Sequence, residues 1–129
     1  MHVNAITNSI ITAAIKVHRR LGPGLLESAY EVCLVHELER AGLRVHRQVP
    51  VPVVYEQVKL ECGFRADIVV ERQVVVELKA KEQLHPIDAA QLLSHLRLLD
   101  LHVGLLINFH EVLLKDGMRR VVNNFREGD

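Results

Sequence analysis

The chain has 129 residues, of which 49% are hydrophobic and 25% charged, and this balance excludes a disordered polypeptide. Sixteen basic and sixteen acidic side chains give a net charge of zero, so a nucleic acid would have to be met by a local patch and not by a global positive field. With no Trp and 4% aromatic residues, an aromatic platform for stacking bases is also excluded.

Two helices are predicted at the start of the chain. Apolar residues recur at three- and four-residue steps from Val3 to Leu21, and the Gly22-Pro23-Gly24 segment ends this helix because Pro cannot continue its hydrogen bonds. A second helix is predicted from Leu25 to Ala41, with Gly42 as its stop. Apolar residues lie nearly all round this second helix, so we expect it to be buried on most sides.

The apolar period changes to two from Arg44, which predicts an extended strand reaching Tyr55. Pro50 and Pro52 confine that part of the strand to a sheet edge or a bulge, because Pro donates no hydrogen bond. After a turn, Val58–Leu60 forms the next short extended segment. The chain then enters its most apolar stretch.

The remaining elements alternate between helix and strand. A helix is predicted to begin at His85-Pro86, where Pro suits the first turn, and Val103–Phe109 is predicted to be a buried strand. Val112–Leu114 and Arg120–Val122 are predicted to form a closing hairpin around a turn at Asp116-Gly117. The order is helix, helix, three or four strands, helix, strand, which indicates a mixed α/β fold with a central sheet flanked by helices.

Three charges interrupt the stretch FRADIVVERQVVVELKA, which otherwise reads as two apolar strands joined by a tight turn. Asp67 lies in the first strand, and Glu77 and Lys79 lie in the second. Strands this apolar are expected to be covered on both faces. Because a buried charge is unfavourable without a partner or a metal, the conflict between pattern and residue type indicates a functional site.

The turn between these strands decides whether the two carboxylates meet. A three-residue loop, Glu71–Gln73, would pair Val70 with Val74 and place Asp67 opposite Glu77, with Cβ atoms about 5 Å apart. A two-residue loop would pair Asp67 with Val76 and send the carboxylates to opposite faces. The turn contains neither Gly nor Asn, so the sequence leaves both registers open.

Two neighbouring carboxylates repel unless a proton or a cation lies between them, and Mg²⁺ or Mn²⁺ is the cation that suits oxygen ligands. A lysine two residues along a strand lies on the same face, where it can orient a water and neutralise charge on a phosphate. Asp67, Glu77 and Lys79 therefore form a set that is complete for metal-assisted phosphodiester hydrolysis. A cross-strand ion-pair network on a half-exposed sheet is the alternative.

Asp67 followed by Glu77-Leu78-Lys79, after two helices and before a helix that carries Gln91, resembles the PD-(D/E)XK nuclease superfamily. The segment Gly24–Tyr30, GLLESAY, is similar to the motif of the bacterial GxxExxY family within it. The segments HRRLGPGLLESAYE, FRADIVV, VVVELKA and GLLINF also resemble that family, so the likeness runs from about Ile10 to Val122. It implies a restriction-endonuclease-like core.

The resemblance also implies a role for each site residue. Asp67 and Glu77 would be ligands of Mg²⁺, with Mn²⁺ as the alternative ion, and Lys79 would be the catalytic lysine. Glu27 would lie near the metal, as a further ligand or as the holder of a water. Gln91 would orient the water, the lysine or a phosphate.

Other interpretations stand beside these roles. Glu27 can be a carboxylate favoured by the dipole of its helix, and Gln91 can be a solvated surface residue. We expect Tyr30 to be packed, with its hydroxyl bonded to a neighbour, and His95 to lie on the surface although it follows Gln91 by one turn. Ala66 stands where the superfamily name has Pro, at a position that varies.

Two functions of different class follow. One is a Mg²⁺-dependent nuclease, with DNA favoured over RNA as its nucleic acid; the alternative is a catalytically inactive nuclease-fold module that binds or regulates. Hydrolysis of a small phosphorylated metabolite stays open as a third. A small domain often needs a second copy to embrace a duplex, which is compatible with a homodimer. A basic run is the candidate phosphate contact, with a solvated face as the alternative: Arg40, Arg44, His46 and Arg47.

The two cysteines, Cys33 and Cys62, form no CxxC pair, and no apolar run approaches the roughly 20 residues of a membrane span. We therefore expect a protein of the reducing cytoplasm with no membrane partner. The length fits one domain covering residues 1–129.

Overall fold

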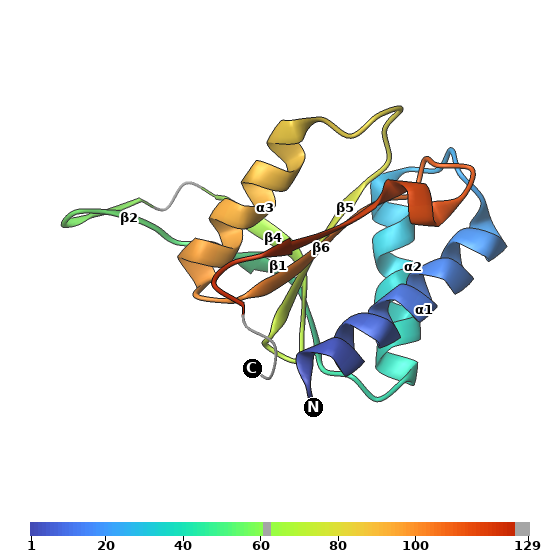
Figure 1. Ribbon diagram of the computed structural model, residues 1–129, viewed down its shortest axis with the longest axis horizontal. Helices are drawn as coiled ribbons and strands as arrows, with labels where there is room; N and C mark the ends of the chain where they lie inside the picture. The colour runs from blue at the N-terminus through green and yellow to red at the C-terminus, as the bar shows by residue number, and fades with distance from the viewer. Residues whose placement is uncertain (61–62, 126–129) are drawn as a thin grey trace.

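The computed structural model describes residues 1–60 and 63–125. None of the helices in these ranges combines the length and the apolarity needed to cross a membrane. Figure 1 shows the arrangement. In chain order the helices and strands are α1 (Val3–Leu21), α2 (Glu27–Arg40), β1 (Val45–Pro50), β2 (Val53–Tyr55), β3 (Val58–Leu60), β4 (Arg65–Val70), β5 (Val74–Lys79), α3 (Pro86–Leu99), β6 (Val103–Asn108), the 3₁₀ turn η1 (Leu114–Gly117) and β7 (Met118–Val122).

The centre of the molecule is a five-stranded sheet with the strand order β1-β4-β5-β6-β7. All neighbours in it are antiparallel except β5 and β6, which are parallel. A parallel pair needs a long crossover, and α3 supplies it between β5 and β6. β2 and β3 form a separate two-stranded hairpin that projects from the body (Figure 1). The expected mixed sheet flanked by helices is confirmed.

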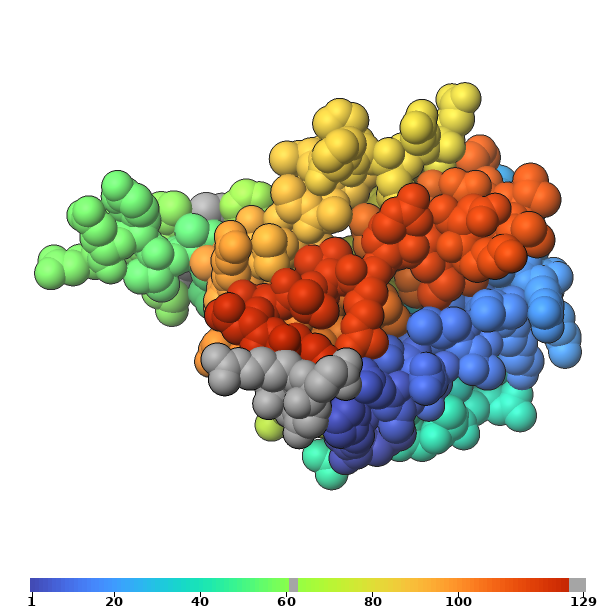
Figure 2. All heavy atoms as spheres, in the orientation of Figure 1, coloured from blue at the N-terminus to red at the C-terminus, as the bar shows by residue number. Residues whose placement is uncertain are grey.

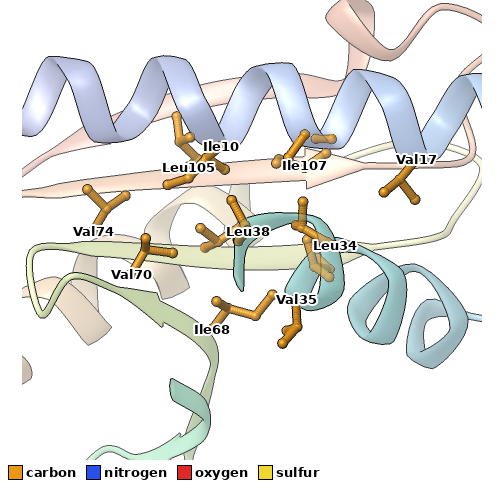
Figure 3. Packing of buried hydrophobic residues seen from close by; sticks show 14 of the residues in the cluster. Ile10, Val17, Leu34, Val35, Leu38, Ile68, Val70, Val74, Leu105 and Ile107 are labelled. Atoms are coloured by element: carbon orange, nitrogen blue, oxygen red, sulfur yellow. The ribbon is translucent and has the colours of Figure 1, made fainter. Parts of the chain in front are cut away.

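Helices cover both faces of the sheet. α1 and α2 pack on one face, where their apolar residues meet those of β4, β5 and β6 in the larger core cluster (Figure 3). α3 packs on the other face, where Leu92 and Leu96 are fully buried. A Cβ added to Gly104 of β6 would lie 2.9–3.1 Å from side-chain atoms of Leu92, so a larger residue would force the Leu92 side chain to shift.

The helix ends follow the chemistry read from the sequence. α1 ends at Leu21 because Gly22 has a φ of +71°, which an L side chain rarely adopts. α3 begins at Pro86, as expected, with the His85 side chain accepting from the Ile87 amide. The expectation that α2 is buried on most sides is wrong. It buries one face against α1 and the sheet, whereas Val32 on the opposite side is 53% exposed.

Three strand predictions need correction. The extended strand does not run on to Tyr55, because β1 ends at Pro50 and the chain then enters the separate β2–β3 hairpin. Five strands therefore precede α3, where three or four were expected. Val112–Leu114 does not form a strand. The closing hairpin instead pairs β7 with the free edge of β6. Leu114, in η1, packs its apolar side chain into the core.

The β4–β5 hairpin has the three-residue loop. Val70 pairs with Val74, and the register continues to Ile68 opposite Val76. Glu71 and Arg72 adopt φ values of +53° and +54°, which are uncommon for residues other than Gly, Asn or Asp. The local strain of this turn is offset by the burial of both strands that it joins.

The sheet is distorted where β1 passes β4. Val45 packs on the side of α1 and α2, whereas Val49 packs on the side of α3, although residues four apart on a regular strand share one face. Between them Gln48 has a φ of +48°. β4 changes sides in the same way, from Ile68 in one cluster to Ala66 in the other. Both strands thus reverse their alternation at one level of the sheet.

Candidate active site

The candidate site lies at the end of the β4–β5 pairing. The two strands are paired up to Ile68 and Val76 and then separate. Asp67, the next residue on β4, closes the gap with its side chain, since its Oδ2 accepts a hydrogen bond of 2.8 Å from the Leu78 amide. Asp67 therefore lies beside Glu77 and Leu78 of β5, in the register that the three-residue loop predicts.

Glu77 is buried, with 7% of its surface exposed. Its Oε1 lies 2.7 Å from Nδ1 of His95, which is itself 5% exposed. The expectation that His95 lies on the surface is therefore wrong. His95 follows Leu92 by three residues on the buried face of α3, and that helix packs directly over β5. The contact uses one of the two oxygens of Glu77.

Lys79 is the last residue of β5 and is half-buried. In the described part of the chain its ammonium group has no carboxylate within 4 Å, so the cross-strand ion-pair network is not formed. The strand end is held by Asn108, whose side chain bonds both the amide and the carbonyl of Lys81. The Lys81 ammonium group pairs with Asp88 at 2.6 Å, which joins this end of β5 to the start of α3.

Glu27 is the first residue of α2, and a tyrosine lock fixes the loop that leads to it. The fully buried Tyr30 donates its hydroxyl to the Gly22 carbonyl at 2.6 Å and accepts from the Leu25 amide at 3.1 Å. Its ring stacks on Phe109 with centroids 4.5 Å apart. The expectation of a packed tyrosine is confirmed, and its role in this structure is to set the position at which α2 begins.

A polar network lines the pocket in front of Asp67. Glu31, one turn after Glu27, is buried and accepts hydrogen bonds of 2.8 Å from Arg47 and from Gln48. Through Gln48 this network reaches the distorted position of β1 beside Asp67. An open pocket of about 390 Å³ is formed here, and its lining consists of Leu26, Glu27, Ser28, Glu31, Gln48 and Asp67.

The carboxylates of this pocket disturb one another's ionisation. Burial raises the pKa of Asp67 to about 7; the Leu78 amide opposes the shift, and the negative charges of Glu77 and Glu27 add to it. Burial also raises the pKa of Glu27 above its ordinary value, against the positive charge of Lys79. Because the charge of each residue acts on the next, the side chains from β4, β5 and α2 share one electrostatic site.

Gln91 is the predicted site residue that this arrangement does not bring into contact. It lies on α3 four residues before His95, so it shares that face of the helix. Its side chain is exposed, and none of the hydrogen bonds of the described residues joins it to Asp67, Glu77 or Lys79.

A model of the PD-(D/E)XK nuclease superfamily matches residues 4–121. This chain belongs to that superfamily. Neither a curated protein nor a solved structure matches the chain significantly. The mixed sheet between two helix layers is the restriction-endonuclease-like α/β fold that this membership implies.

Nucleases of the PD-(D/E)XK superfamily generally depend on divalent metal ions. Among residues 1–60 and 63–125, no group of three or more His, Cys, Asp and Glu side chains is arranged to hold a metal. Asp67 and Glu77 are the two neighbouring carboxylates where β4 and β5 separate. The pair alone still suits Mg²⁺, which is commonly bound through one or two carboxylates and keeps several waters.

Sequence reasoning missed three side chains that hold this PD-(D/E)XK site together. His95 had a signal, because it lies within the apolar stripe between Leu92 and Leu96. Glu31 had a weaker one, since it repeats Glu27 one helical turn later. Gln48 had none, because a left-handed residue inside a strand follows from tertiary packing and not from its own preference.

Proposed function

We propose that this chain is a Mg²⁺-dependent nuclease that hydrolyses phosphodiester bonds, and that it belongs to the GxxExxY family within its superfamily. The observation that carries the proposal is the placement of Asp67 beside Glu77 where β4 and β5 separate, with Lys79 two residues further along. A bound Mg²⁺, or Mn²⁺ in its place, would supply positive charge to the phosphate and acidify a water.

In this proposal Asp67 and Glu77 hold the metal. Asp67 is fixed by the Leu78 amide through Oδ2, which leaves its second oxygen available. Glu77 is fixed by His95 through Oε1, which leaves Oε2 available. His95 is therefore a positioning residue, since it acts through the carboxylate that it orients. Each ligand is thus oriented by a hydrogen bond to one of its two oxygens.

In this scheme three further side chains act around the attacking water and the phosphate: Lys79, Glu27 and Gln91. The ammonium group of Lys79 has no competing ion pair among the described side chains, so it is available to orient the attacking water and to offset charge on the phosphate. Glu27, at the start of α2, would be a further ligand of the metal or would hold a water. Gln91, whose side chain is exposed on α3, contacts the phosphate or the water.

We infer DNA as the preferred nucleic acid and the cytoplasm as the compartment. The open pocket beside Asp67 is bordered by exposed Leu26 and Ser28, so a polymer can lie across it without entering a closed cavity. Cys33 is a free thiol, which suits a reducing compartment. The expected phosphate contacts of the basic run remain on the surface, except that Arg47 is engaged by Glu31.

Cleavage of labelled DNA and RNA, linear and circular, tests the proposal with and without Mg²⁺ or Mn²⁺. We expect metal-dependent cleavage that Lys79→Ala lowers by about 100-fold or more, with an unchanged circular dichroism spectrum. Lys115→Ala, at an exposed lysine in η1, is the matched control and should retain full activity. Cleavage that survives Lys79→Ala, or that needs no metal, would contradict the assignment.

One observation favours the alternative, a nuclease-fold module that binds or regulates without cleaving. Glu77 is already engaged by His95, and the described side chains form no three-donor metal group. Titration calorimetry with Mg²⁺ and Mn²⁺ separates the two functions. Binding that is lost in Asp67→Asn supports the nuclease, whereas the absence of binding to either ion, together with intact binding of nucleic acid, supports the module.

A further inference from the structure

The β2–β3 hairpin, here called the arm (Val53–Leu60), projects from the body of the molecule (Figures 1 and 2). Within residues 1–60 and 63–125, its two strands pair with each other and with no strand of the main sheet. Neither strand packs extensively on any helix. An isolated two-stranded hairpin is marginally stable in water, so the arm gains stability from whatever covers it.

The arm has one apolar face. Its register pairs Val53 with Leu60 and Tyr55 with Val58, which places these four side chains on the same side. Three of them are strongly exposed: Tyr55 by 68%, Val58 by 55% and Leu60 by 39%. A contiguous apolar surface of this kind on a water-soluble element indicates a binding surface.

A groove of about 860 Å³ follows β1 at the edge of the sheet. Its floor is apolar and is formed mainly by Val45, Val49, Val69, Leu99 and Leu101. β1 pairs with β4 on one side, and no described strand pairs with its other side. The same polypeptide thus carries an unpaired sheet edge with an apolar groove, and a projecting hairpin with an apolar face.

The charges of the arm match those of the groove. Among the described residues of the arm, Glu56 at the tip and Lys59 on β3 are the charged side chains. The groove presents Arg72 and Glu39, whereas its other arginine, Arg47, is already paired with Glu31. Each charge on the arm therefore finds its opposite in the groove, which favours one docking and disfavours others.

The arm leaves β1 at Pro50 and continues away from it, with Pro52 restricting the backbone at its base (Figure 1). It therefore does not reach the groove of its own chain. Its two described charges cancel, whereas binding to a nucleic acid backbone depends on Lys and Arg. A second copy of this chain offers both surfaces, since its groove can take the arm of the first copy and its arm can fill the groove of the first copy.

We propose that two copies form a symmetric dimer by arm exchange, in which the apolar face of each arm fills the groove of the other copy. Such a contact is isologous, because the same arm and groove serve both partners. It buries both apolar surfaces and covers the free edge of β1, which would otherwise be a site of uncontrolled pairing. The dimer does not depend on nuclease activity.

Sedimentation equilibrium of the full chain over a range of concentrations tests the proposal. We expect a monomer–dimer equilibrium whose dissociation constant rises about tenfold or more in Tyr55→Asp. Val112→Asp is the matched control, since Val112 is 84% exposed outside the arm and the groove, and it should associate as the wild type does. Circular dichroism should show both variants folded, because both positions are exposed.

Reversing charges on the arm and in the groove tests whether the arm docks in that groove. Glu56→Arg should weaken the dimer, and Glu56→Arg combined with Arg72→Glu should restore it. A wild type that is monomeric at every concentration overturns the proposal, as does a Tyr55→Asp variant that dimerises normally. Loss of DNA binding in Tyr55→Asp without a change in association would instead assign the arm to nucleic acid. Failure of the double variant to recover overturns the groove as the docking site.

Discussion

The two hairpins of this chain share a local structure but have opposite surroundings. β4–β5 lies between two helix layers, and its apolar side chains are buried on both faces. β2–β3 stands in solvent, and its apolar side chains are exposed. In the first hairpin the residues that conflict with their surroundings are charged, and in the second they are apolar. In both, we place function at the residues that contradict their environment.

The largest contrast between the hairpins should appear on removing one leucine from each. Leu78→Ala in β5 deletes a fully buried side chain and should lower the free energy of unfolding by about 4 kcal/mol. Leu60→Ala in β3 should cost less than about 1 kcal/mol, because that side chain is 39% exposed. Urea unfolding at low protein concentration measures both. Equal losses would mean that the arm packs on its own chain.

Removing the histidine that contacts Glu77 tests how strongly the buried hairpin depends on pairing its charges. His95→Ala leaves a buried carboxylate without its partner and should lower the free energy of unfolding by about 3 kcal/mol. His110→Ala, at an exposed histidine, should change it by less than about 0.5 kcal/mol. Thermal unfolding of the two variants supplies the comparison. A harmless His95→Ala would show that Glu77 is solvated.

Two tyrosines offer the next test. Tyr30→Phe deletes the hydroxyl that bonds Gly22 and Leu25, and it should lower the free energy of unfolding by about 1–3 kcal/mol. The same change at Tyr55, on the exposed arm, deletes a hydroxyl that has water as its alternative partner and should have almost no effect. Urea midpoints for the two variants should therefore diverge; coincident midpoints would rule out the tyrosine lock.

The smallest expected effect concerns pH. The carboxyl of Asp67 has a pKa of about 7 in the folded protein against 3.8 for its ordinary value. The unfolded chain releases this proton first, so the folded state loses stability as pH rises from about 4 to about 7. Asp67→Asn, which keeps an acceptor for Leu78, should be more stable than the wild type above pH 7, by on the order of 1–2 kcal/mol after allowance for partial exposure.

The gain should vanish below about pH 3, where Asp67 is protonated in both states. Thermal unfolding at several pH values, in the presence of a chelator, measures it. A gain that is larger at pH 4 than at pH 8 would show the sign of the shift to be wrong.

The sequence predicts much of the fold because its strongest signals are local. The apolar period of α1, the Gly22 stop and the His85-Pro86 start depend on neighbouring residues alone, and each is confirmed. For the β4–β5 loop the sequence allows two registers. The structure adopts the three-residue loop, although Glu71 and Arg72 have no preference for left-handed backbone.

The parts that sequence reasoning missed depend on residues distant in the chain. His95 is buried because α3 crosses over β5, and no pattern within α3 alone reveals what lies beneath it. Pro50 and Pro52 predict an edge or a bulge at this point of the chain. They do not predict a separate arm, because the arm depends on β2 pairing with β3 and not with β4. The site roles of Asp67, Glu77, Lys79, Glu27 and Gln91 remain predictions.

The tyrosine lock matters for how the activity of homologous sequences is inferred from this motif. Tyr30 and Gly22 secure the shape of a loop, and Glu27 begins a helix; a chain that no longer cuts any substrate still needs that shape in order to fold. The GLLESAY segment thus indicates that the fold is kept, and it does not indicate whether the chain still hydrolyses a substrate. Substitution of Lys79, whose side chain forms no ion pair among the described residues, would be the earlier sign of lost activity.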